Sequence, residues 1–176
     1  MKINAALIGT GIGMKHLEAI DGYKNSVVKI ICEKKIKKKK LLKKKYPDKN
    51  ITTDENEIFK DKTINFLSIA SYDNDHYSQI IRAIKNNMNI VVEKPMCLTF
   101  GELKKINKLI KKSSCKIISN LVLRTNKLFI YLKNQVEKKK IIYIEADYLW
   151  GRPEKLYGWR SRISKYSIIL GAAIHM

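Results

Sequence analysis

Short apolar runs separated by amphipathic segments organise the chain up to Asn120. Most of these runs are rich in isoleucine and valine; the first stops at Gly9, and the second stops at Glu33. Continuous apolar runs of this length are typical of parallel strands that are buried on both faces of a sheet. We therefore expect strands at residues 3–8, 26–32, 51–52, 64–70, 89–93 and 116–119.

The segments between these runs carry apolar residues at helical spacing. They predict helices at 14–23, 34–46 and 75–87, and a further helix that begins with a capping box formed by Thr99 and Glu102. Strands and helices that alternate in this way are typical of an α/β fold with a doubly wound parallel sheet, the Rossmann architecture. We assign residues 1–120 to such a domain.

The pattern changes after Asn120. A helix near 125–138 leads into an expected long strand at 141–150, and an irregular segment with glycine and proline follows. We expect residues 121–176 to be the beginning of a second domain that is incomplete at its end.

Charge is the one feature of the composition that points towards a nucleic acid. The net charge is +20, from 36 basic and 16 acidic residues. Lysine far outnumbers arginine, however, and arginine is the residue that proteins prefer for reading nucleic acids. The lysine-rich helix at 34–46 is therefore interpreted as a solvated surface, with no specific nucleic-acid partner.

The remaining composition favours a cytoplasmic protein that does not enter a membrane. The apolar run Ile64–Ala70 is among the longest and is far too short to cross a bilayer, and the N-terminus lacks the pattern of a signal peptide. The widely spaced Cys32, Cys97 and Cys115 predict free thiols in a reducing compartment and do not form a metal site.

A glycine-rich turn joins the first strand to the first helix, and it reads Gly9-Thr10-Gly11-Ile12-Gly13. Glycines let a backbone approach a pyrophosphate closely, and the start of a helix offers N–H groups to it. The usual spacing of this motif is Gly-x-Gly-x-x-Gly, so the third glycine here comes one residue early. An ordinary strand-to-helix turn is the alternative interpretation.

Glu33 ends the second strand, about twenty residues after the turn, where dinucleotide-binding domains place the acid that accepts from the ribose hydroxyls. A carboxylate at this position favours NAD, because it would repel the 2′-phosphate of NADP. Lys34 and Lys35 follow directly and could tolerate that phosphate. A solvated charge at the end of a strand is the alternative interpretation of Glu33.

Four segments together resemble the Gfo/Idh/MocA oxidoreductases. They are 9–16, 68–76, the Glu-Lys-Pro segment within 91–99, and Gly-Trp-Arg at 158–160 leading to 171–175. The resemblance covers the whole chain. It implies a nicotinamide-dependent dehydrogenase that acts on a sugar, a polyol or a nucleotide-linked sugar, with a second, α+β domain whose sheet is mainly antiparallel.

The resemblance also implies roles for individual residues. Lys94 matches a lysine near the nicotinamide and the reacting hydroxyl, and His175 matches the histidine that acts as general base. The resemblance further suggests Ser71, His76, Glu93, Lys94 and Pro95 as contacts to the cofactor. Residues near the cofactor or substrate are expected at Arg124, Trp159 and Arg160, for which an ion-paired helix start and a packed tryptophan are the structural alternatives. The second domain implies a homo-oligomer for a full-length form.

Two departures from the family keep other functions open. Gly171 stands where the family has an aspartate beside its histidine, and the chain ends one residue after His175. A truncated or degenerate dinucleotide-binding module without turnover is therefore a second hypothesis. A nucleic-acid-binding protein, supported only by the charge, is a third.

Overall fold

The computed structural model describes residues 2–145, 147, 149, 151, 154, 157–164, 167–171 and 174. It divides the chain into two compact units, Met1–Ser119 and Asn120–Met176.

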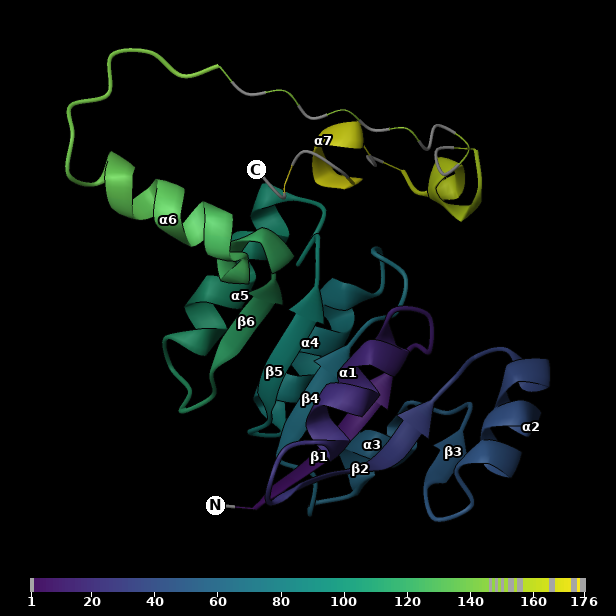
Figure 1. Ribbon diagram of the computed structural model, residues 1–176. Helices are drawn as coiled ribbons and strands as arrows, with labels where there is room; N and C mark the ends of the chain where they lie inside the picture. Colours follow the sequence, from purple (N-terminus) through teal and green to yellow (C-terminus); the bar gives the residue numbers. More distant parts are fainter. Residues whose placement is uncertain are drawn as a thin grey trace. The chain divides into compact units, whose positions relative to one another are not determined.

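A six-stranded sheet forms the centre of the first unit, with the strand order β3-β2-β1-β4-β5-β6 (Figure 1). The strands are β1 (Ile3–Ile8), β2 (Ser26–Cys32), β3 (Asn50–Thr52), β4 (Phe66–Ile69), β5 (Asn89–Glu93) and β6 (Ile117–Asn120). The pairings of β1 with β2 and β4, of β2 with β3, and of β4 with β5 are all parallel. The strand order reverses between β1 and β4, and ligands of such sheets bind at the carboxyl ends of the strands beside this point.

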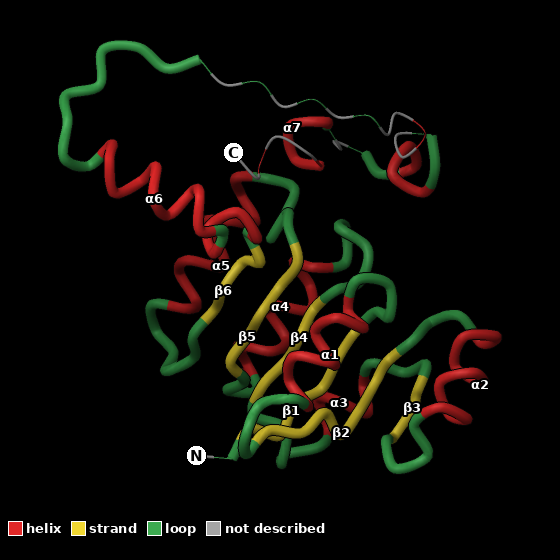
Figure 2. The backbone as a smooth tube through the Cα atoms, in the orientation of Figure 1, coloured by secondary structure: helices red, strands yellow, loops and turns green. Residues whose placement is uncertain are grey.

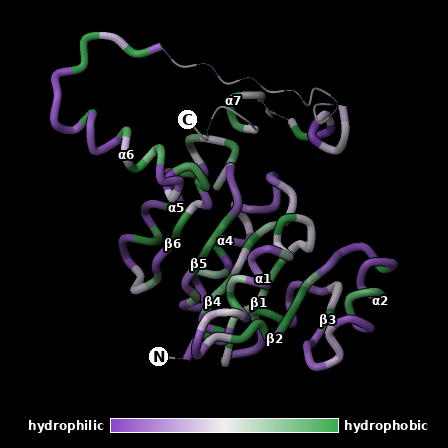
Figure 3. The backbone as a smooth tube through the Cα atoms, viewed as in Figure 1, coloured by the Kyte–Doolittle hydropathy of each residue, from purple (hydrophilic) through white to green (hydrophobic). Residues whose placement is uncertain are grey.

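Helices connect successive strands and cover both faces of the sheet (Figure 2). They are α1 (Gly13–Asp21), α2 (Ile36–Lys45), α3 (Asn56–Lys60), α4 (His76–Lys85) and α5 (Phe100–Ile110). Successive residues of β1 serve opposite faces: Ala5 and Leu7 join one core cluster, with Leu17 of α1, whereas Ala6 and Ile8 join the other. This double burial explains why the strands are mostly apolar, as the hydropathy colouring shows along β1 and β2 (Figure 3). The predicted Rossmann fold is confirmed.

The second unit contains little regular structure among its described residues. It has the 3₁₀ helices η1 (Val122–Thr125) and η3 (Trp159–Arg162), the helix α6 (Lys127–Val136) and the four-residue helix α7 (Ile168–Gly171). The sequence predicted a strand at 141–150. This prediction is wrong for residues 141–145, 147 and 149, which lie in no strand. A strand is stable only when another strand pairs with it, and the described residues after Asn120 contain none.

Two kinds of feature are absent from the described part of the chain. None of its helices combines the length and the apolar character needed to span a bilayer. No group of three or more His, Cys, Asp or Glu side chains is arranged there to hold a metal ion.

Candidate functional site

The glycine turn between β1 and α1 is shaped by close packing against β4. Gly9 has φ of +88°, and a Cβ atom on it would lie 2.3 Å from the carbonyl oxygen of Ala70. A Cβ on Gly13 would lie 3.0 Å from Leu7 Cδ1. Each position therefore disfavours a side chain, and α1 begins directly against the sheet.

Gly11 differs from its two neighbours because it faces open space. A Cβ atom built on it would meet no atom within 4 Å. The exposed backbone of Gly11 and Ile12 leads into the first turn of α1, where the N–H groups of Met14 and Lys15 donate to the carbonyls of Gly11 and Ile12 at 3.4 and 2.9 Å. An open glycine and the positive end of a helix dipole fit the pyrophosphate of a dinucleotide.

Glu33 lies beside this turn and is almost fully buried, with 7% of its surface exposed. Thr10 Oγ1 donates a hydrogen bond to Glu33 Oε2, and the N–H of Lys35 donates to Oε1 at 2.8 Å. The backbone of Glu33 is held by β3, since its N–H donates to the carbonyl of Thr52 at 2.9 Å. The structure thus brings together the turn and the acid that the sequence placed at separate strand ends.

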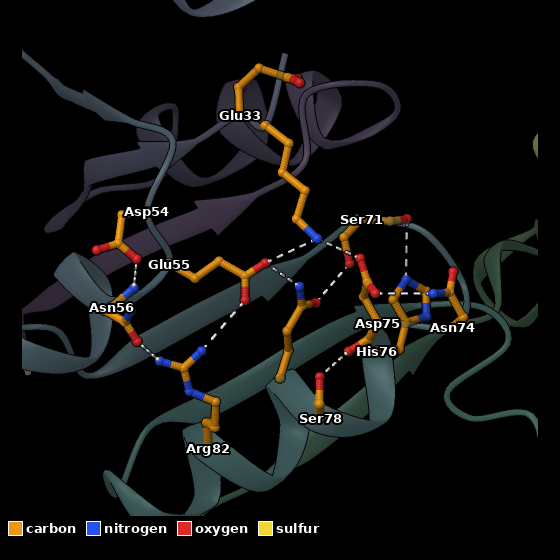
Figure 4. Close-up of polar contacts among 12 residues, drawn as sticks. Glu33, Asp54, Glu55, Asn56, Ser71, Asn74, Asp75, His76, Ser78 and Arg82 are labelled. Atoms are coloured by element: carbon orange, nitrogen blue, oxygen red, sulfur yellow. Dashed lines mark hydrogen bonds and ion pairs between the residues drawn. The ribbon is translucent and has the colours of Figure 1, made fainter. Parts of the chain in front are cut away.

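Glu55, Asp75 and Arg82 belong to a polar network (Figure 4), which Lys34 also enters. Lys34 Nζ donates to Asp75 Oδ2 at 2.7 Å and lies 3.7 Å from Glu55 Oε1. Burial alone would lower the pKa of Lys34, but the hydrogen bond and charge of Asp75, together with the charge of Glu55, raise it overall. Lys34 is therefore held as a cation between the segment before α3 and the start of α4.

The same network fixes the loop after β4. Ser71 Oγ donates to Gln79 Oε1 at 2.7 Å, and Gln79 Nε2 donates to Glu55 Oε1 at 2.8 Å. Arg82 Nη1 lies 3.6 Å from Glu55 Oε2. Gln79 is buried in α4, so Glu55 and Ser71 are joined through a side chain that has little freedom. The sequence analysis did not single out Glu55, Asp75 or Gln79, and of these only Asp75 lies in a segment that carries the family resemblance, 68–76.

Polar contacts also hold the Glu93-Lys94-Pro95 segment at the end of β5. His16, on α1, is hydrogen-bonded through Nδ1 to Ser68 Oγ at 2.8 Å and donates from Nε2 to Glu93 Oε1 at 3.0 Å. His76, at the start of α4, is fully buried and donates from Nδ1 to the carbonyl of Pro95 at 2.7 Å. Lys94 lies half-buried between these two anchored residues.

The sequence treated these two histidines differently. A contact from His76 to a cofactor was expected and stays a prediction; its buried ring donates to the carbonyl of Pro95 and lies 3.4 Å from the carbonyl of Ser71. His16 was not among the predicted site residues, although it stands in one of the segments that carry the family resemblance.

The remaining predicted residues belong to the second unit. Arg124 lies exposed in η1, and Trp159 and Arg160 lie in η3, where the Arg160 guanidinium is 4.2 Å from the centre of the Trp159 indole. His175 lies outside the described residues. Their grouping with Lys94 stays a prediction.

Comparison with known proteins identifies a family. Residues 3–121 match the model of GFO_IDH_MocA, described as an oxidoreductase family with an NAD-binding Rossmann fold. A curated relative, the uncharacterized oxidoreductase YhhX of Escherichia coli strain K12, is 24% identical over 111 residues, which are 61% of this chain and 32% of the relative. The chain therefore spans about a third of the length of that relative.

Solved structures share the fold. Myo-inositol 2-dehydrogenase from Lactobacillus plantarum superimposes with a TM-score of 0.83 at 19% identity, over 99% of this chain and 54% of that protein. The WlbA (WbpB) dehydrogenase from Thermus thermophilus, solved in complex with NAD and UDP-GlcNAcA, gives a TM-score of 0.69 at 23% identity, over 79% of this chain and 48% of that protein. At these identities the likeness concerns the fold alone.

Proposed function

The chain belongs to the Gfo/Idh/MocA family of oxidoreductases with an NAD-binding Rossmann fold, and on that premise we propose that it is an NAD-dependent dehydrogenase. Its substrate would be a hydroxyl group of a sugar, a polyol or a nucleotide-linked sugar. The observation that carries the proposal is the bond from Thr10 to Glu33, which joins the glycine turn to the acid at the end of β2.

The first unit supplies the groups that would hold the cofactor. The backbone of Gly11 and Ile12 and the positive end of the α1 dipole would bind the pyrophosphate. The Glu33 carboxylate retains lone pairs that would accept from the ribose hydroxyls, and its negative charge disfavours a 2′-phosphate. Because Thr10 and Lys35 already orient this carboxylate, little conformational freedom would be lost when it binds the ribose.

The chemical step would depend on Lys94. The bound nicotinamide would supply the acceptor for the hydride. Lys94 Nζ would donate a hydrogen bond to the reacting oxygen and stabilise the negative charge that develops as the proton leaves. His16 through Glu93, and His76 through Pro95, act as positioning residues because they fix the backbone on both sides of Lys94.

Residues from 121 onwards would contribute the beginning of the substrate domain. We assign the general base to His175, whose neutral imidazole would accept the hydroxyl proton, and substrate contacts to Arg124, Trp159 and Arg160. These assignments follow the family resemblance, residue by residue.

A second candidate function is a dinucleotide-binding module without turnover. Gly171 at the end of α7 favours it, because this position carries no carboxylate to orient or assist His175. The two functions share the cofactor site and differ only in the chemistry that follows binding.

Titration calorimetry with NADH, together with assays on a panel of sugars and polyols, tests both candidates. We expect NADH to bind more tightly than NADPH. Lys94→Ala should keep its affinity for NADH and lose about 10²-fold or more in kcat, since it removes a group needed only for the reaction. Lys104→Ala, on α5, is the matched control and should keep both properties.

Each outcome has a distinct meaning. Unchanged turnover in Lys94→Ala would contradict the catalytic role of this lysine. NADH binding without turnover on any substrate would support the binding module. Absence of binding by both cofactors would contradict the proposed use of the site.

A further inference from the structure

Two lysines follow Glu33, and a cation at this place is what a Rossmann domain uses to accept the 2′-phosphate of NADP. Glu33 alone therefore does not settle which cofactor is preferred, because a neighbouring lysine could offset its charge. The position of the Lys34 ammonium group decides whether that lysine is available.

We propose that Asp75 and Glu55 select NAD over NADP by binding Lys34 and withholding its ammonium group from the ribose. This inference rests on the proposed function, and it names a specificity determinant that lies outside the motif formed by the glycine turn and Glu33.

Lys34 lies at the surface, with 52% of its side chain exposed, but its ammonium group is paired on two sides. Lys34 Nζ lies between two carboxylates that come from different segments, at 2.7 Å from Asp75 and 3.7 Å from Glu55. The side chains of these two acids are only 24% and 16% exposed, so water competes weakly for their oxygens. Their combined charge also raises the pKa of Lys34, which keeps it protonated.

The two carboxylates are themselves fixed, so they cannot follow Lys34 towards a ligand. Glu55 accepts from the buried Gln79 and is paired with Arg82. Asp75 immediately precedes α4, and Asn74 Nδ2 donates to its Oδ1 at 3.1 Å. Moving Lys34 to a 2′-phosphate would therefore leave two enclosed carboxylates without their shared cation, a cost that NAD does not incur.

Lys35 is the other cation beside Glu33, and it provides an internal comparison. Its backbone N–H donates to Glu33, and its side chain is exposed. If charge near the ribose were all that mattered, Lys34 and Lys35 would be equivalent. The two lysines instead differ in their availability to a 2′-phosphate, because only Lys34 is released when Asp75 or Glu55 is neutralised.

The experiment measures the ratio of the dissociation constants for NADPH and NADH, by calorimetry on the whole chain. Asp75→Asn and Glu55→Gln each keep the shape of the side chain and remove its charge. Each should shift the ratio towards NADPH by about fivefold, the scale of a partly exposed charge pair. Adding Lys34→Ala to Asp75→Asn should abolish the shift, whereas adding Lys35→Ala should leave most of it.

Asp54→Asn is the matched control for a general loss of negative charge. Asp54 adjoins Glu55 and accepts from the N–H of Asn56 at 2.9 Å, a bond that an asparagine can replace. An unchanged ratio in both Asp75→Asn and Glu55→Gln would overturn the inference, as would an equal shift in Asp54→Asn or a shift that survives Lys34→Ala.

The design separates this inference from the proposed function. If the unmodified chain binds NADH and the variants keep its ratio, only the selection by Asp75 and Glu55 fails. If the unmodified chain binds neither cofactor, the proposed function fails and the inference falls with it. Circular dichroism on each variant establishes that it is folded, and Glu55→Gln serves alone if Asp75→Asn is not.

Discussion

The two units of the chain use apolar side chains in opposite ways. In the first unit, Leu7, Ile31 and Leu67 lie in strands and are completely buried. In the second, Leu128 to Leu132 form a run of five apolar residues on α6, and each remains at least 41% exposed. The first arrangement builds a core with two faces, and the second shows that a helix can form without one. A site that must hold its groups rigidly therefore rests on the first unit.

The largest expected effect concerns the turn that leads into α1. Gly9→Ala should lower the free energy of unfolding by about 4 kcal/mol or more, because it combines a positive φ with a clash against the Ala70 carbonyl. Gly101→Ala, on α5, is the control: a Cβ there meets nothing within 4 Å, and the change should be within about 1 kcal/mol. Urea unfolding measures both. Similar values for the two variants would contradict the close packing at Gly9.

A smaller loss of stability is expected when one apolar side chain is truncated in each unit. Leu67→Ala removes a fully buried side chain and should lower the free energy of unfolding by about 3 kcal/mol. Ile130→Ala removes a side chain that is 45% exposed and should lower it by less than about 1 kcal/mol. Thermal and urea unfolding give the two values. A large loss in Ile130→Ala would show that α6 supports a core after all.

Helix caps give a matched pair across the units, with smaller effects. Thr99 and Glu102 form a complete capping box on α5, and Asn126 Oδ1 accepts from the N–H of Leu128 on α6. Thr99→Ala should lower the stability of the first unit by about 1 kcal/mol. Asn126→Ala should instead reduce the helical content of α6 and leave the main unfolding transition in place. Circular dichroism and hydrogen exchange distinguish these outcomes, and equal shifts of the main transition would contradict the expectation.

The smallest effect concerns an exposed acid at the edge of the first unit. Hydrogen bonds from Thr52 and Asn50 lower the pKa of Glu57 below its usual value. Because the folded-state pKa is the lower one, this acid contributes stability above its ordinary pKa and loses it as the pH falls through the folded value. Thr52→Val should raise the Glu57 pKa, as measured by NMR titration of its carboxyl carbon. An unchanged pKa would show that these surface contacts are not fixed.

Local patterns in the sequence were sufficient for much of the fold. The strands β1 and β2 have the predicted bounds, because each is an apolar run that a glycine or an acid interrupts. The strand expected at 141–150 is wrong in its described residues for the opposite reason: the residues favour extension, but pairing depends on a partner elsewhere in the chain. Strand formation is therefore the less local property, and the less predictable one.

The candidate site also combines features that a local pattern predicts with contacts that it does not. The glycine turn and Glu33 could be predicted because a short spacing and a strand end define them. The bond from His16 to Glu93 joins residues 77 positions apart, and that from Gln79 to Glu55 joins residues 24 apart. Such contacts depend on how helices are laid on the sheet, which no motif encodes. The predicted roles of Lys94 and His175 still await a test.

The obstacles at Gly9 and Gly13 differ in kind, and this difference governs how the turn can evolve. At Gly13 the nearest atoms belong to the side chains of Leu7 and Ala70, so a smaller residue at either position could make room for a new one. At Gly9 the obstacle is the backbone carbonyl of Ala70, which every amino acid possesses. No partner substitution at position 70 removes it. Among related chains, position 13 is therefore free to vary together with its neighbours, whereas glycine at position 9 should be lost only when the path of the backbone itself changes.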